Sequence, residues 1–367
     1  MGRFIIILLS GLFFVSCAER QKNVEESGMG YAKGLSVTEY RDYTRVVVGD
    51  PWNKGGILDT YILVRRDSAV PDSLPEGTVV RVPLERVVVY SDVHARVMAE
   101  LGVVSAVKGV CDARYFKTAA IVSGLASGGV ADCGSSLSPT VEQVVSAKPD
   151  AIMLSPYQNA GYGALENLGV PIVKMADYME STPLGRAEWI KLMGLLFDRK
   201  AKADSIFSEV EKSYLNLKKM AAGVPERPKV ISETMTGGVW YVPGGGSYKA
   251  AMFADAGGDY PWAGNVSQGS LALDFAQVLE KAQDADLWLV TTYGRRLTAK
   301  DFLDIYEHND KFAAYVNHGV YYVDSSQAGI FEETPFHPDL LLKEYVKLFH
   351  PELLPGYQLK YYRQMEY

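Results

Sequence analysis

The chain has 367 residues and a formal net charge of −7, and this acidic balance argues against binding nucleic acid through a basic surface. A chain of this length exceeds one hydrophobic core, so two lobes or domains are expected. After the first residues no stretch of about 18 uninterrupted apolar residues occurs, so no second membrane span is predicted.

The first residues have the pattern of an export signal. Arg3 precedes an apolar run over residues 4–15, which is too short for a mature membrane span, and Ser16 and Cys17 follow. We predict a lipoprotein signal peptide over residues 1–16, with Cys17 as the lipidated first residue of the mature protein. Acyl chains contribute about 0.8 kcal/mol per buried methylene, so this anchor would hold the protein on a lipid bilayer outside the cytoplasm. The competing interpretation is an N-terminal core helix.

Two segments of different character follow the anchor. Residues 17–35 are polar and lack an apolar period, which predicts a flexible tether. Within residues 36–83, the runs 45–48, 59–64 and 78–82 are rich in β-formers and are separated by Gly, Pro and Asn. This pattern predicts a small β-rich N-terminal extension.

Predicted strands and helices alternate from residue 84 to residue 198. A strand over residues 87–90 leads to a helix over residues 94–101. Ser138 and Pro139 are predicted as the N-cap and first residue of a later helix. Such alternation favours a mainly parallel sheet, and ligands collect at the loops that follow the carboxyl ends of its strands.

A second unit of the same kind covers residues 223–353, and residues 354–367 form a predicted tail. Between the two units a helix is predicted over residues 199–222, about 33 Å long at 1.5 Å per residue. One long helix joining two lobes leaves a cleft between them and resists wide hinge bending. The predicted fold class is therefore α/β, with two lobes of mainly parallel sheets joined by a single backbone helix, plus a small N-terminal β extension.

Short segments along both units carry a resemblance to a known family. They are residues 86–89, 101–103, 109–112, 142–152 and 168–173 in the first unit, and residues 244–247, 256–259, 319–323 and 350–353 in the second. In this order and spacing the chain resembles the substrate-binding proteins of ABC importers for iron chelates and vitamin B12, of the lipoprotein type. The resemblance covers about residues 84–353.

The resemblance implies capture of a ligand between the lobes and delivery to an ABC permease in the membrane, by a monomer with no cofactor and no enzymatic activity. The implied ligand is an iron chelate or haem, with cobalamin as the alternative. A cleft for such a ligand needs aromatic walls and a few polar groups. The candidate contacts are Arg114, Tyr115, Tyr157, Tyr178, Trp240, Tyr241, Trp262, Tyr293 and Arg295.

Each candidate contact has a competing interpretation. An aromatic ring could pack in a core or on a lobe surface, and Arg114 or Arg295 could form a surface ion pair. If the two arginines do face the ligand, they favour an anionic iron chelate over a corrinoid.

Members of the resembled family dock on the permease through one carboxylate on each lobe. Asp259 stands at the expected place in the second lobe. The first-lobe loop over residues 155–160 has no carboxylate at the matching place, and Glu166 is the candidate substitute.

Cys111 and Cys133 remain after the anchor. In an oxidising compartment a disulfide between them would contribute about 3 kcal/mol on the chain-entropy model. The sequence leaves this disulfide and two free thiols equally open.

Sequence cues for other functions are weak. The five histidines are scattered without a His-x-x-x-His pair, so no metal site is predicted, and His94 is the best placed of them to reach a ligand. No Gly-x-Ser-x-Gly elbow occurs, and the glycine run at residues 244–246 lacks the order of a phosphate loop. An enzyme on the same scaffold and an adhesion or scaffold lipoprotein remain as alternatives of other classes.

Overall fold

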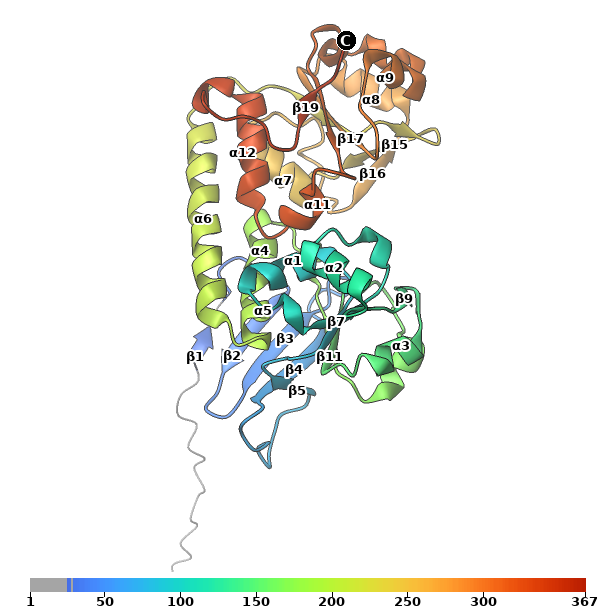
Figure 1. The fold of residues 1–367 in the computed structure, drawn as a ribbon. Coiled ribbons are helices and arrows are strands. Elements are labelled where there is room, and N and C mark those ends of the chain that lie inside the picture. Colours follow the sequence, from blue (N-terminus) through green and yellow to red (C-terminus); the bar gives the residue numbers. More distant parts are fainter. Residues whose placement is uncertain (1–24, 28) are drawn as a thin grey trace, which may run out of the picture.

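In the computed structural model, which describes residues 25–27 and 29–367, two α/β lobes are joined by one long helix (Figure 1). The predicted signal peptide, Cys17 and residues 18–24 and 28 of the predicted tether lie outside the described residues. Within them, no helix is both long and apolar enough to cross a membrane. The two lobes, the long helix and a separate N-terminal sheet confirm the predicted fold class.

The first lobe is built on a parallel sheet. In spatial order its strands are β12 (Ile172–Lys174), β11 (Ala151–Leu154), β6 (Val87–Val89), β7 (Val107–Val110) and β8 (Ala131–Asp132). Strands β6 and β11 are buried throughout, as expected of unbroken apolar runs in a covered parallel sheet. The chain continues from β6 to one side and later returns on the other, so the carboxyl ends of β6 and β11 form a topological switch point.

Helices cover this sheet and continue toward the second lobe. They are α1 (Asp92–Leu101), α2 (Ala119–Ser127), α3 (Val141–Ser146), α4 (Pro183–Glu188) and α5 (Ile190–Leu196). The predicted start of a helix at Ser138 and Pro139 is wrong, because these residues form β10 (Ser138–Pro139), which pairs with β9 (Gly134–Ser135). The N–H of Thr140 donates to the carbonyl of Cys133 at 2.8 Å, which holds the chain extended until α3 begins.

The second lobe is also built on a mainly parallel sheet, but one edge strand of this sheet is antiparallel. Its main sheet has the order β13 (Val230–Ser232), β17 (Leu287–Thr292), β18 (Val320–Asp324) and β19 (Arg363–Gln364), and only β19 is antiparallel. A smaller antiparallel sheet contains β14 (Met235–Thr236), β15 (Val239–Pro243) and β16 (Ser270–Leu273). The predicted tail thus supplies a strand, and Tyr361 and Tyr362 are buried with it.

Helices of the second lobe surround these two sheets. They are α7 (Tyr248–Asp255), α8 (Phe275–Ala282), α9 (Ala299–Ile305), α10 (Ala313–Val316), α11 (Ile330–Glu333) and α12 (Pro338–Phe349).

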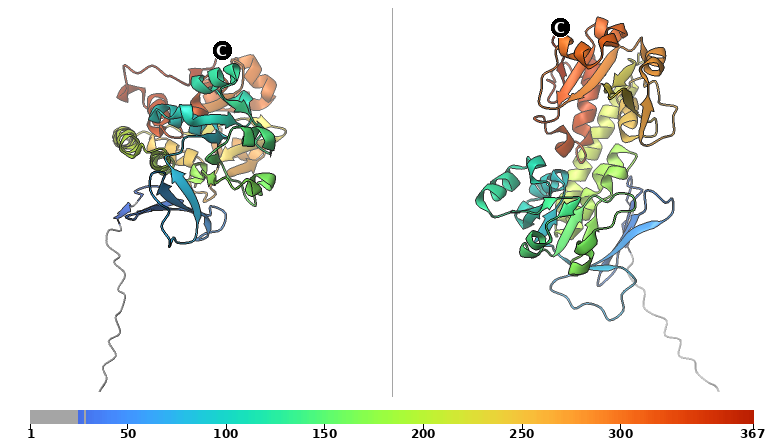
Figure 2. Two further views of the ribbon diagram at one scale, coloured as in Figure 1. Left: turned by 60° about the horizontal axis from the view of Figure 1, so that its bottom comes forward. Right: turned by 90° about the vertical axis from the view of Figure 1, so that its right-hand side faces the viewer.

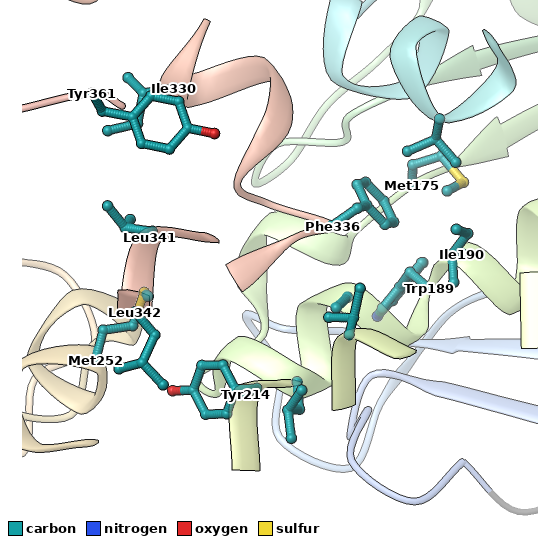
Figure 3. Close-up of a cluster of buried hydrophobic side chains, with 14 of the residues drawn as sticks. Met175, Trp189, Ile190, Tyr214, Met252, Ile330, Phe336, Leu341, Leu342 and Tyr361 are labelled. Atoms are coloured by element: carbon teal, nitrogen blue, oxygen red, sulfur yellow. The ribbon is translucent and has the colours of Figure 1, made fainter. Parts of the chain in front are cut away.

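Helix α6 (Lys200–Ala222) forms the brace between the lobes, with 23 residues and thus a length of about 34 Å. Its buried side chains follow the predicted helical spacing, from Ala203 to Ala221. Tyr214 donates from its hydroxyl to Asp255 of α7 at 2.7 Å. Because α6 packs on α5 at one end and on α12 at the other, one hydrophobic cluster runs through both lobes, and Figure 3 draws part of it.

The N-terminal extension is a five-stranded sheet that flanks the first lobe (Figure 2). Its strands are β1 (Glu25–Ser27), β2 (Leu35–Glu39), β3 (Thr44–Gly49), β4 (Ile57–Arg65) and β5 (Thr78–Val82). The hydroxyl of Tyr61 donates to the carbonyl of Ile172 at 3.0 Å and accepts from the N–H of Lys174 at 2.8 Å. The extension therefore satisfies backbone groups at the outer edge of β12, which would otherwise be an open strand edge.

Two carboxylates of the first lobe bind the backbone where the chain enters the extension. Glu188 accepts the N–H groups of Gly30, Tyr31 and Ala32 at 2.8–2.9 Å. Glu180 accepts those of the next two residues. The prediction of a flexible tether up to residue 35 is therefore wrong for its last part, since residues 25–27 form β1 and residues 30–34 are bound to the lobe.

Candidate functional site

A cavity of about 570 Å³ lies between the two lobes, and we call it the inter-lobe cavity. The first lobe contributes residues 178–181, which follow the end of β12. The second lobe contributes Glu233 after β13, Tyr241 and Pro243 of β15, Ser247, Tyr248 and Lys249 at the start of α7, and residues 268–270. Loops at the carboxyl ends of the parallel strands β12 and β13 thus supply part of its wall, as expected for a ligand site in this fold class.

A second hollow of about 380 Å³ lies at the switch point of the first lobe, and we call it the switch-point cavity. Tyr90 and Ser155 line it directly after β6 and β11, together with Tyr157 and Tyr162. The hydroxyl of Tyr178 donates to the carbonyl of Pro156, next to Tyr157. Because Tyr178 lines the other cavity, the two hollows lie next to each other at this contact.

A glycine run places the second-lobe wall of the inter-lobe cavity. A Cβ atom added at Gly245 would lie 2.3 Å from the carbonyl oxygen of Asn265, so only glycine lets the two backbone segments approach. Ser247 then caps α7 by accepting the N–H of Ala250 at 3.2 Å. Tyr248 and Lys249 follow in the first turn, which fixes both side chains at the cavity.

Glu233 is the carboxylate of the second-lobe wall, and several contacts fix its position. Its backbone has φ 63°, a left-handed conformation that is costly for a residue with a side chain. The indole N–H of Trp288 donates to its carbonyl at 2.7 Å, and Lys249 forms an ion pair with its carboxylate. Burial acts to lower the pKa of Lys249, but the neighbouring Glu233 outweighs it and raises that pKa, so Lys249 is charged at neutral pH.

Glu180 is the corresponding carboxylate on the first lobe. It is buried, and its oxygens accept from the N–H groups of Lys33 and Gly34 at 2.9–3.0 Å and from the indole N–H of Trp189 at 3.0 Å. The N-terminal segment thereby fixes a residue that also lines the inter-lobe cavity.

A buried polar triad lies where α1, α4 and the loop after β12 meet. His94 Nε2 is 3.0 Å from Asp177 Oδ1, and Arg186 Nε donates to Asp177 Oδ2 at 3.2 Å. Burial acts to raise the pKa of Asp177, but the hydrogen bonds and charges of His94 and Arg186 outweigh it and hold that pKa below its ordinary value. His94 is 1 % exposed and lines neither cavity, so its contact is structural in this conformation.

Ion pairs also cross directly from lobe to lobe. Arg96 of α1 pairs with Glu333 of α11 at 2.8 Å. Lys117 pairs with Glu332 at 2.9 Å and donates to the carbonyl of Ser325 at 2.8 Å. These contacts hold α11 over the first lobe, where Figure 1 shows it above α1 and α2.

The structure distributes the predicted ligand contacts over three environments. Tyr178 and Tyr241 line the inter-lobe cavity and Tyr157 lines the switch-point cavity. Four others are exposed and line neither cavity: Arg114, Tyr115, Tyr293 and Arg295. The guanidinium of Arg114 lies 4.6 Å from the centre of the Tyr115 ring, so this pair interacts on the surface.

The two predicted tryptophan contacts require a correction. Trp240 has no exposed surface, stacks on Trp288 at 5.2 Å between ring centres, and donates from its indole N–H to Ser232. Trp262 is 6 % exposed and packs against Tyr260. Both rings are core residues of the second lobe, as in the competing interpretation, because their flat faces are already covered.

The lining residues that sequence reasoning missed include Tyr90, Tyr162, Glu180, Glu233, Tyr248 and Lys249. Tyr90 and Glu233 directly follow the strands β6 and β13 of the structure, and the rule that pointed to residues after other strands applies to both positions. Tyr248 and Lys249 follow the glycine run, whose role in placing α7 depends on a distant backbone segment.

Asp259 and Glu166 are both exposed and lie on different lobes, and Glu166 accepts the N–H of Tyr162 at 2.8 Å. Their docking role stays a prediction.

Cys111 and Cys133 are free, buried thiols in one cluster, and burial raises their pKa values to about 12 and about 11. Among the described residues, no group of three or more His, Cys, Asp or Glu side chains could hold a metal ion.

The chain matches the model of a known protein family. Residues 87–327 fit the model of a family described as periplasmic binding protein. This match covers most of both lobes and begins at β6, so the N-terminal extension lies outside it.

Two uncharacterised lipoproteins of Methanocaldococcus jannaschii are similar along nearly the whole chain. One is 28 % identical, over 92 % of this chain and 84 % of its own length. The other is 26 % identical, over 95 % of this chain and 90 % of its own length.

Solved structures share the fold at low identity. A Staphylococcus epidermidis periplasmic solute-binding protein, described as a possible iron-binding protein, has a TM-score of 0.58 and 16 % identity, over 72 % of this chain and 98 % of its own. IsdE of S. aureus complexed with haem has a TM-score of 0.55 and 19 % identity, again over 72 % and 98 %. An Fe3+-hydroxamate transport protein of Saccharomonospora viridis has a TM-score of 0.55 and 19 % identity, over 73 % and 94 %.

Proposed function

Because the chain belongs to the periplasmic binding protein family, we propose that it captures an iron complex for an ABC importer. The ligand would be a ferric siderophore or haem, held in the cleft and passed to a permease without covalent chemistry. The observation that carries this proposal is the inter-lobe cavity, to which both lobes contribute tyrosine: Tyr178 from the first, Tyr241 and Tyr248 from the second.

The chemistry of the cavity walls suits a bulky chelate. Phenol rings offer flat apolar faces together with a hydroxyl, and Ser181, Ser247 and Gln268 add small polar groups. The cavity volume of about 570 Å³ lies within the range of small-molecule sites. Fold neighbours bound to haem or named for hydroxamate transport support the same ligand class. Cobalamin remains the alternative for this cleft.

The proposed location is the outer face of a membrane. Cys17 would carry the lipid anchor, in line with the relatives named lipoproteins. Asp259 and Glu166, exposed on the two lobes, would be the carboxylates that meet the permease.

A ligand screen tests the proposal. We expect haem, a ferric siderophore or cyanocobalamin to raise the melting temperature, since a ligand at a hundred times its Kd adds about 2.7 kcal/mol to the folded state. The variant Gln268→Trp, which places a large ring in the inter-lobe cavity, should abolish the shift.

The matched control is Leu137→Trp, in the switch-point cavity at a side chain that is 82 % exposed. If only Leu137→Trp blocked binding, the ligand would occupy the first lobe rather than the cleft. If none of the three ligand classes bound the unmodified protein, the proposed function would be wrong.

A further inference from the structure

The inter-lobe cavity has few charged groups, and each is already engaged. Its charged lining residues are Glu180, Glu233 and Lys249. Glu180 binds backbone N–H groups of the N-terminal segment, and Glu233 forms an ion pair with Lys249. Two carboxylates against one ammonium group leave the described wall with a formal charge of −1.

Arg186 and Lys117, two cations outside the cavity wall, are also paired. Arg186 lies 5.9 Å from the ring of Tyr248, but its guanidinium binds Asp177. Lys117 crosses the lobe boundary to Glu332 and Ser325. Arg114 and Arg295, the cations expected to favour an anionic chelate, line neither cavity. Within the described part of the chain, an anionic ligand would therefore find no unpaired cation in this wall.

We infer that the inter-lobe cavity selects an uncharged or cationic metal complex with a broad apolar face, and that Glu233 is the residue that excludes polyanionic complexes. This inference rests on the proposed function and specifies its ligand class. A polyanion would have to lie beside Glu180 and Glu233 in a partly desolvated cleft, where repulsion between like charges is stronger than in water. Selectivity through such repulsion is a common way to reject a competing ligand of similar shape.

Glu233 is held in a way that suits this role. Its left-handed backbone is fixed by Trp288, and its carboxylate is held by Lys249 and by the hydroxyl of Thr291 at 3.4 Å. A carboxylate fixed in this way cannot swing out to make room for an anion. Backbone strain of this kind is concentrated at ligand-binding positions, because the surrounding contacts must maintain it.

The test uses two ferric complexes that differ in charge. A tris-hydroxamate complex is neutral, whereas a tris-catecholate complex carries three negative charges. With the intact protein, we expect titration calorimetry to give a Kd at least about tenfold lower for the tris-hydroxamate. Equal affinities, or tighter binding of the tris-catecholate, would overturn the inference and leave the proposed function standing. The absence of binding by both complexes, haem and cyanocobalamin would instead overturn the proposed function.

Charge variants assign the selectivity to its residue. Glu233→Gln should reduce the ratio of the tris-catecholate Kd to the tris-hydroxamate Kd by about three- to tenfold. Lys249→Gln should increase this ratio, because the two changes alter the wall charge in opposite directions. Asp304→Asn removes a negative charge from an exposed pair on α9 and should leave the ratio unchanged. An equal change for both complexes in Glu233→Gln, or an effect of Asp304→Asn as large as that of Glu233→Gln, would refute the role of Glu233.

Discussion

The boundary between the lobes is closed by direct contacts on one side and hollow on the other. On the side of α1 and α11 it is closed by the ion pairs of Arg96 and Lys117 and by packing of Phe336 against His94 at 6.4 Å between ring centres. On the other side the same boundary is hollow and lined with tyrosine and small polar side chains. The closed side fixes how far apart the lobes lie, and the hollow side is left free for recognition.

This difference has a mechanical consequence. Helix α6 packs on helices of both lobes, and the closed side adds direct contacts, so large hinge rotation would break packing as well as ion pairs. Substitutions on the closed side should therefore change stability, whereas substitutions on the hollow side should change ligand affinity.

The largest expected effect is in the buried triad. Asp177→Ala should lower the free energy of unfolding by about 3–5 kcal/mol, because it leaves His94 and Arg186 without their buried partner. Urea unfolding measures the change. The control Asp284→Ala removes an exposed carboxylate paired with Lys229 and should stay within about 0.5 kcal/mol. Similar small losses in both variants would show that the triad contributes little.

On the hollow side, Tyr241→Ala should weaken ligand binding by about 1–3 kcal/mol and change stability little, since its side chain is half exposed in the cavity wall. Titration of the ligand found in the screen measures the loss. Tyr293→Ala, at an exposed tyrosine of the same lobe outside both cavities, is the matched control. Equal losses in the two variants would mean that the cavity wall is not the recognition surface.

Each ion pair between the lobes should contribute less to the free energy of unfolding than the buried triad does. A double-mutant cycle of Lys117→Ala and Glu332→Ala should give a coupling energy of about 0.2–1 kcal/mol, because the lysine is partly exposed and its charge is screened. The coupling should fall as salt is added. If the coupling energy is absent at low salt, this ion pair does not help to hold the two lobes together.

The smallest expected effect is a pH dependence at His337, which lies 2.9 Å from Glu100 across the lobe boundary. Burial acts to lower the pKa of His337, but Glu100 outweighs it and raises that pKa above its ordinary 6.5. The stabilising contribution is thus complete below pH 6.5 and is lost as pH rises through the raised pKa of the folded state.

Urea unfolding of the unmodified protein and of His337→Gln measures this contribution. The difference between them should be a few tenths of a kcal/mol at pH 6 and should shrink at pH 8.5. A difference that grows with pH would contradict the assigned direction of the shift.

Local rules were sufficient for the plan of the fold. Short apolar runs predicted β6 and β11, and the helical spacing from Ala203 to Leu217 predicted α6. Such patterns of apolar residues can be recognised within each segment alone. The same rules failed at Ser138 and Pro139, where pairing with Gly134 outweighs a helix-start signal.

Only the tertiary structure decided which predicted contacts face the cleft. Trp240 and Tyr241 are neighbours on β15 and point to opposite faces of the strand, so one must be buried where the other is exposed. The sequence shows this alternation but not which face meets Trp288 and which meets the cavity, because that depends on a strand about fifty residues away. The pairing of Glu233 with Lys249, and of Glu180 with the N-terminal segment, is likewise a product of long-range packing.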